Sequence, residues 1–105
     1  MKISEAEFRE LLAKSTVPVV ADFYAEWCGP CKAFGPMFER VGKQMAPGYA
    51  FCKVNIDEAG NLCNEVGVRV VPTLMIFNGK RKVASHEGSF ASEAALETFV
   101  KKSAK

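Results

Sequence analysis

The chain has 105 residues, a formal net charge of +2, and 49% hydrophobic residues. That length suits one domain over residues 1–105, with a hydrophobic core that needs no metal or disulfide staples. The mild charge favours neither nucleic acid nor an anionic membrane as the main partner. No apolar run is long enough to span a bilayer. The N-terminal residues 1–5 lack the apolar stretch of a secretory signal, so a cytoplasmic location is expected.

The first predicted elements are a short edge strand, a helix and a buried strand. Residues 1–3 are the edge-strand candidate. Ser4 and Glu7 have the spacing of a helix capping box, and apolar residues at helical spacing follow from Phe8. The resulting helix, of about ten residues, is expected to end near Ser15. Residues 17–24 are apolar and β-branched, which is typical of a strand covered on both faces.

The middle of the chain predicts a long helix, a strand and a short helix. Apolar residues recur at helical spacing after Cys28, at Phe34, Phe38, Val41 and Met45. Residues 49–56 indicate a second buried strand. Residues 61–66 indicate a short helix, which Gly67 is expected to end.

The last third predicts a hairpin and a final helix. Residues 73–77 and 82–86 are the two strands, joined by a tight turn at Asn78-Gly79, and Ser92 is the expected N-cap of the last helix. The alternation of strands and helices predicts an α/β fold. We expect a central mixed β-sheet of about five strands flanked by about four α-helices.

The four cysteines have the spacing C-x2-C-x20-C-x10-C. Structural zinc sites usually contain two close pairs, so this spacing argues against metal. A zinc half-site and an inert surface disulfide remain the alternatives for Cys28 and Cys31. Cys52 and Cys63 stand separately and are interpreted as buried packing residues. A regulatory thiol is the alternative for Cys63 if its side chain is exposed.

The segment Trp27-Cys28-Gly29-Pro30-Cys31-Lys32 lies at the junction between a predicted strand and a predicted helix. A thiolate at a helix N-terminus is stabilised by free backbone N–H groups and by the helix dipole, so Cys28 is predicted to attack a substrate disulfide. Cys31, one turn further in, is expected to be more shielded and to resolve the mixed disulfide. Pro30 is compatible with the first helical turn, and Gly29 leaves the backbone open to a substrate.

The chain resembles the thioredoxin family over nearly its whole length, on the motif Trp-Cys-Gly-Pro-Cys-Lys following Val-Ala-Asp-Phe-Tyr-Ala-Glu. The resemblance implies the thioredoxin fold. It also implies that Asp22 is a buried carboxylate beneath the disulfide and that Lys53 is its paired lysine. Burial would raise the pKa of Asp22, which could then accept the proton of Cys31, while Lys53 would oppose that rise. A purely structural ion pair is the alternative.

The same resemblance implies a substrate-binding surface around the two cysteines. Val71-Pro72 matches the family's cis-proline loop, where the backbone of Val71 would pair with an extended substrate segment. Gly88 would admit the substrate backbone. Trp27 would be a flat apolar surface next to Cys28, with an ordinary half-buried core aromatic as the alternative. Gly35 departs from the pattern, because alanine is more usual there.

The function implied is a general protein dithiol–disulfide oxidoreductase, a thioredoxin, with protein-disulfide reductase activity through a reversible Cys28–Cys31 disulfide. No cofactor would be bound, and electrons would come from NADPH through thioredoxin reductase. The expected partners are that reductase and disulfide-containing proteins, and the chain is expected to be a monomer. A non-catalytic binding module and a disulfide-forming oxidant are the alternatives.

Overall fold

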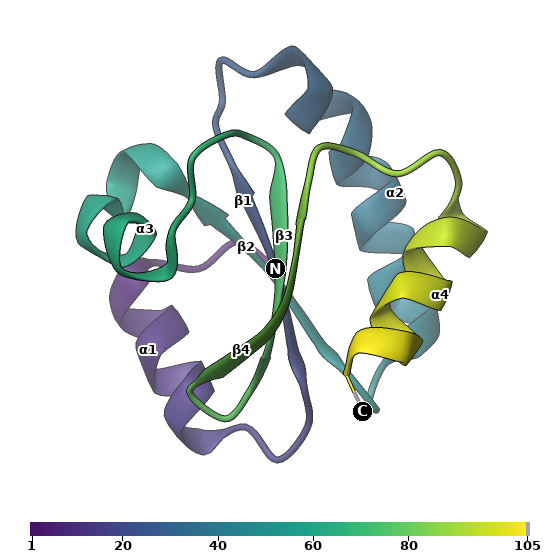
Figure 1. The fold of residues 1–105 in the computed structure, drawn as a ribbon, viewed down its shortest axis with the longest axis horizontal. Coiled ribbons are helices and arrows are strands. Elements are labelled where there is room, and N and C mark those ends of the chain that lie inside the picture. The colour runs from purple at the N-terminus through teal and green to yellow at the C-terminus, as the bar shows by residue number, and fades with distance from the viewer. Residues whose placement is uncertain (105) are drawn as a thin grey trace.

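A central β-sheet separates two pairs of helices in the computed structural model, which describes residues 1–104 (Figure 1). The helices are α1 (Glu5–Lys14), α2 (Gly29–Met45), α3 (Gly60–Val66) and α4 (Glu93–Ser103). The strands are β1 (Val19–Tyr24), β2 (Ala50–Asn55), β3 (Thr73–Asn78) and β4 (Arg81–Glu87), and a short 3-10 turn, Ile56–Glu58, precedes α3. Within this described part, no helix is long and apolar enough to cross a membrane.

The sheet is mixed, with the strand order β2-β1-β3-β4. β1 and β2 are parallel, while β3 pairs antiparallel with both β1 and β4. The predicted α/β fold is therefore confirmed with four strands in place of about five. The expected edge strand at residues 1–3 is reduced to a single parallel bridge between Lys2 and Lys53. Two backbone hydrogen bonds of Lys53, to Met1 and Ile3, hold this bridge.

Local sequence signals account for the helix ends. The Glu7 N–H donates to Ser4 Oγ at 3.1 Å, and the Ser4 N–H donates to Glu7 Oε1 at 2.9 Å, so the capping box is confirmed. Gly67 ends α3 with a φ of +86°, a conformation that favours glycine. Ser92 caps α4 by accepting the N–H of Ala95.

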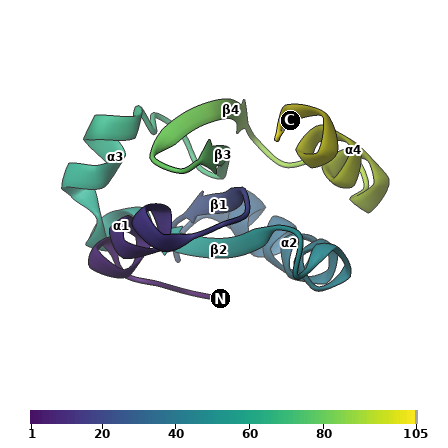
Figure 2. The same cartoon turned by 90° about the horizontal axis from the view of Figure 1, so that it is seen from below.

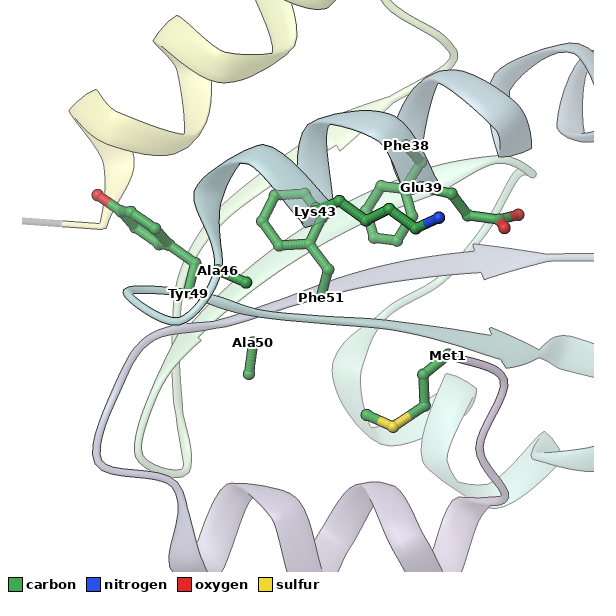
Figure 3. A pocket seen from close by; sticks show the side chains of 9 residues that line it. Met1, Phe38, Glu39, Lys43, Ala46, Tyr49, Ala50 and Phe51 are labelled. Atoms are coloured by element: carbon green, nitrogen blue, oxygen red, sulfur yellow. The ribbon is translucent and has the colours of Figure 1, made fainter.

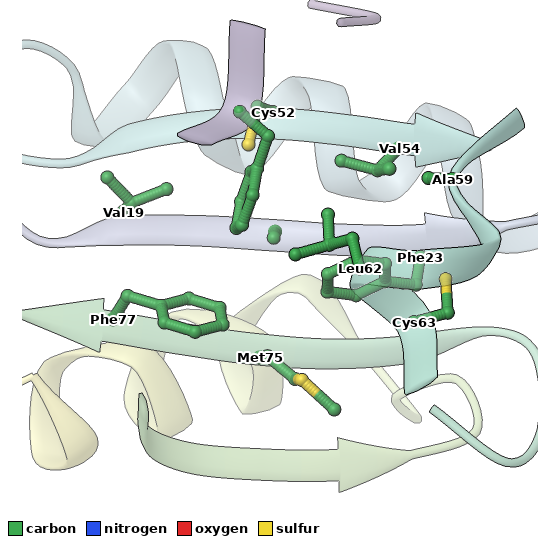
Figure 4. Packing of buried hydrophobic residues seen from close by; sticks show 11 residues of the cluster. Val19, Phe23, Cys52, Val54, Ala59, Leu62, Cys63, Met75 and Phe77 are labelled. Carbon is green, nitrogen blue, oxygen red and sulfur yellow. The ribbon is translucent and has the colours of Figure 1, made fainter. Parts of the chain in front are cut away.

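Each face of the sheet is covered by one pair of helices, α1 and α3 on one side and α2 and α4 on the other (Figure 2). Phe8 lies at the centre of the first layer, with its ring 5.9 Å from Phe23 and 5.4 Å from Phe77 in edge-to-face arrangements. Cys52 and Cys63 belong to this cluster and are 0% and 8% exposed (Figure 4). Their predicted burial is confirmed. The predicted stripe of α2, which begins at Phe34, is buried in the second layer.

The strand predicted at residues 49–56 is present as β2, Ala50–Asn55, but the prediction that it is buried holds only in part. β2 is an edge strand, and only Cys52 and Val54 are buried, while the other four residues of the strand are half-buried. On its outer edge β2 is paired only by the bridge between Lys2 and Lys53, so several of its residues stay partly open to solvent. The interior strands β1 and β3 are buried almost throughout.

Candidate active site

The carboxyl end of β1 leads directly into α2, and the two cysteines of the motif lie at this junction. Cys28 and Cys31 are joined by a disulfide. Cys28 is the N-cap of α2, and its Sγ accepts the backbone N–H of Cys31 at 3.2 Å. This donor belongs to the set of N–H groups that a helix leaves free in its first turn. In the reduced protein the same N–H would stabilise a thiolate on Cys28.

The exposed fraction does not distinguish the two cysteines, because each is 4% exposed. The expectation that Cys31 is the more shielded is therefore not met in this disulfide-bonded state. What differs is their surroundings. Cys28 Sγ lies 3.7 Å from the carbonyl oxygen of Val71, whereas Cys31 lines a cleft that also contains Lys53 and Glu39.

Asp22 lies in the middle of β1 and is fully buried. Among the described residues, neither of its carboxylate oxygens has a hydrogen-bond partner. Burial raises the pKa of Asp22 to about 7, the positive charge of Lys53 acts to lower that pKa, and the negative charge of Glu39 acts to raise it. Both effects agree with the sequence analysis, which expected burial to raise the pKa of Asp22 and Lys53 to oppose that rise.

Lys53 is the register partner of Asp22 on the parallel strand β2. Its ammonium, however, pairs with Glu39 of α2, with Nζ 3.4 Å from Oε2. Glu39 was not among the residues singled out from the sequence. It follows Gly35 by four positions and Cys31 by eight, so helical periodicity could have placed it on the same face of α2.

The loop before β3 brings Val71 and Pro72 to the cysteines. The Val71-Pro72 peptide bond is cis, as the family resemblance implied. Val71 packs against the cluster that contains both cysteines, and the Gly88 N–H donates to the Pro72 carbonyl oxygen at 2.8 Å. Gly88 has a φ of +91°, and no atom lies within 4 Å of the position that its Cβ would take.

Trp27 is 68% exposed, so it is a surface aromatic and not a half-buried core residue. Its indole N–H donates to Asp57 Oδ2 at 2.9 Å. Asp57 was not anticipated from the sequence, since its role depends on a contact with a residue 30 positions away.

Trp27 and Val71 line a groove of about 490 Å³, together with Val70, which is 47% exposed. Gly29 and Pro30 are also exposed beside it.

A separate groove of about 350 Å³ runs between α2 and the β2 edge, away from the cysteines (Figure 3). Phe38 and Phe51 form its apolar part. Within residues 1–104, no group of three or more potential metal ligands gathers in either groove or elsewhere. Cys52 and Cys63 lie in the core beneath α1 and α3, in a different cluster from Cys28 and Cys31. The four cysteines therefore do not form one zinc site.

Together, the fold and the disulfide at the start of α2 define a dithiol–disulfide redox protein. The family model described as Thioredoxin matches residues 1–102. Thioredoxin from Synechocystis is 35% identical over 100 residues, covering 95% of this chain and 94% of that protein. Chloroplastic thioredoxin M4 from Arabidopsis thaliana is 38% identical over 97 residues, and the chain spans half of its length. A crystal structure of chloroplastic thioredoxin z superposes with a TM-score of 0.85 at 27% identity, covering 96% of this chain and 90% of that one.

The chain therefore belongs to the thioredoxin family. It is a thioredoxin-type dithiol–disulfide oxidoreductase with protein-disulfide reductase activity, carried by the Cys28–Cys31 pair.

Proposed function

We propose that this protein is a general reductant of protein disulfides that is itself reduced by an NADPH-dependent thioredoxin reductase. The observation that carries the proposal is the redox disulfide at a helix N-terminus, beside a buried carboxyl and an exposed apolar groove. Reduction of the disulfide requires two electrons and two protons. NADPH would supply two electrons and one proton as a hydride through the reductase, and the second proton would come from solvent. No bound cofactor enters this chemistry.

In the proposed reaction, the Cys28 thiolate attacks one sulfur of a substrate disulfide. A mixed disulfide forms, and the other substrate sulfur leaves as a thiolate and takes up a proton. The Cys31 thiol then gives its proton to the carboxylate of Asp22 and attacks Cys28 Sγ. The substrate's second sulfur leaves as a thiolate and takes up a proton from solvent, so the substrate gains two thiols while Cys28 and Cys31 become a disulfide.

The substrate would bind as an extended segment across the loop of Val71 and Pro72. Val71 offers its backbone for strand-like pairing, and Gly88 leaves open space next to Pro72. Trp27 and the neighbouring groove offer an apolar surface for side chains that flank the substrate disulfide. Gly29 and Pro30 present no long side chain over the cysteines, so a target backbone can approach closely.

The experiment is insulin reduction by the wild type and by Cys28→Ser and Cys31→Ser variants, with NADPH and thioredoxin reductase as the electron source. We expect turnover with the wild type alone, and accumulation of a mixed disulfide on Cys28 in Cys31→Ser. Undiminished turnover by either variant would contradict the mechanism. Reduction with dithiothreitol but not with the reductase would contradict only the proposed electron donor. A cytoplasmic location and a monomeric state belong to the same proposal, and they are tested by fractionation and by light scattering.

A further inference from the structure

Cys31, Gly35 and Glu39 follow one another at intervals of four residues along α2, which places them on one face of the helix. All three line a cleft of about 190 Å³. Lys53 lines the same cleft from β2, and its register partner Asp22 is buried on the adjacent strand. Side chains of register partners leave a sheet on the same face, so Asp22 also projects towards α2. The cleft thus links the resolving cysteine to a second carboxylate, that of Glu39.

In the oxidised protein the ammonium of Lys53 is held by Glu39 and the ring of Tyr24. Lys53 Nζ lies 3.4 Å from Glu39 Oε2 and 5.1 Å from the centroid of the Tyr24 ring. The Lys53 side chain is only 11% exposed, whereas that of Glu39 is 57% exposed. Within residues 1–104, the carboxylate of Asp22 has no hydrogen-bond partner. Lys53 therefore pairs with the exposed carboxylate of Glu39 and not with the buried carboxylate of Asp22.

Gly35 provides the space in which this ammonium sits. A Cβ at position 35 would lie 3.1 Å from Lys53 Nζ, closer than an ordinary van der Waals contact. The absence of a side chain at Gly35 thus allows Lys53 to reach Glu39 past the backbone of α2. Figure 3 shows Glu39 projecting from α2 next to Lys43. Glu39 lines both this cleft and the groove along β2.

We propose that Glu39 is a positioning residue that competes with Asp22 for the ammonium of Lys53, and so controls when Asp22 can accept the proton of Cys31. The inference rests on the proposed function, since it concerns the proton step of the same reaction. When Lys53 is bound to Glu39, the buried carboxyl lacks a close counter-charge and retains its proton. When Lys53 turns to Asp22, the carboxylate is stabilised and can act as the base.

Of the lysines that line the cleft, Lys53 is mostly buried, whereas Lys2 and Lys32 are exposed. The remaining titratable groups that line it are Lys2, Tyr24, Glu26, Cys31 and Lys32. Lys2 and Glu26 pair with each other at 3.7 Å, with both side chains more than half exposed. From the opposite side, β3 places the apolar Leu74 beside Asp22. Glu39 and Lys53 are therefore the two charges that act most directly on the pKa of Asp22, in opposite directions.

The test is a carbon-13 NMR titration of the Asp22 carboxyl in the oxidised protein, labelled at aspartate. Asp22 and Asp57 are the only aspartates in the chain, so assignment needs a single variant. Glu39→Gln should lower the pKa of Asp22 by about one unit, because it frees Lys53 and removes a negative charge. In a Lys53→Met background the same substitution should produce a clearly smaller shift. The matched control is Glu93→Gln, which removes a half-buried carboxylate that pairs with Arg40 on α2.

An unchanged Asp22 pKa in Glu39→Gln would overturn the inference, as would an equal shift with and without Lys53 or an equal shift in Glu93→Gln. A kinetic readout accompanies the titration. The pH midpoint for resolution of a glutathione mixed disulfide on Cys28 should fall in Glu39→Gln by the same amount as the pKa. The titration needs no substrate, so it tests this inference even if insulin reduction fails. Conversely, normal insulin reduction with an unmoved pKa would reject the inference and leave the proposed function intact.

Discussion

Replacing Asp22 with asparagine should stabilise the oxidised protein above neutral pH and leave its stability at about pH 4 nearly unchanged. Asp22 is fully buried, and its pKa is raised from an ordinary value of 3.8 to about 7. Between those two values the folded state holds a proton that the unfolded state has lost, so the free energy of unfolding falls as the pH rises. Asparagine has nearly the same shape and does not ionise, so it removes this dependence.

The magnitude follows from the difference in pKa between the folded and unfolded states. A difference of about three units, at about 1.4 kcal/mol per unit, corresponds to about 4 kcal/mol. The loss of stability begins near the unfolded pKa and is complete once the pH exceeds the folded value. Compared with a typical total stability of about 5–15 kcal/mol for a small domain, this effect is large.

Urea unfolding of oxidised wild type and Asp22→Asn, measured at a series of pH values from about 4 to 8, tests the reasoning. The two proteins should have similar free energies of unfolding at the acid end, and the variant should be about 4 kcal/mol more stable at the alkaline end. A difference that stays constant over the whole range would refute the argument, because it would reflect packing and not ionisation. The slope of free energy against urea should be the same for both proteins.

Three further outcomes are expected from residues outside the proton step. In the folded, reduced protein, iodoacetamide should modify Cys28 and spare Cys52, because burial raises the pKa of Cys52 to about 12. Peptide mass spectrometry after brief alkylation measures this, and rapid labelling of Cys52 would contradict it. Trp27→Ala should change the free energy of unfolding by less than about 1 kcal/mol, since the side chain is 68% exposed. The same variant should have a higher KM in insulin reduction, and an unchanged KM would contradict a role in substrate binding. Phe8→Ala should destabilise the protein by about 3–5 kcal/mol in urea unfolding while leaving the pH dependence from Asp22 in place, and a cost below about 1 kcal/mol would contradict its central position in the core.

Much of the fold is encoded by short-range signals, and these were predictable. The capping box at Ser4 and the left-handed Gly67 each depend on a few neighbouring residues, and so does the hairpin turn, which lies at Gly79-Lys80, one residue later than predicted. The position of β2 at the sheet edge was not predictable in this way. Its composition resembles that of an interior strand, and strand order depends on contacts between segments that are distant in sequence.

The same distinction between local signals and tertiary contacts applies to the candidate site. Cys28 and Cys31 could be recognised because strand, motif and helix are contiguous in the chain. The contact of Trp27 with Asp57 and that of Lys53 with Glu39 could not, because each joins two elements whose relative placement is a tertiary property. On a helix, an exposed glutamate such as Glu39 has the same sequence signature as any solvated surface charge.

The exposure of Trp27 has a practical consequence. It is the only tryptophan in the chain, it lies next to Cys28 in sequence, and it borders the groove proposed for substrates. The indole emission of the whole protein therefore originates at the site itself, without background from a tryptophan in the core. Opening of the disulfide, arrival of a target peptide and loss of the Asp57 hydrogen bond all change the surroundings of this one fluorophore. Unlabelled protein thus carries an intrinsic optical reporter of redox state and target binding.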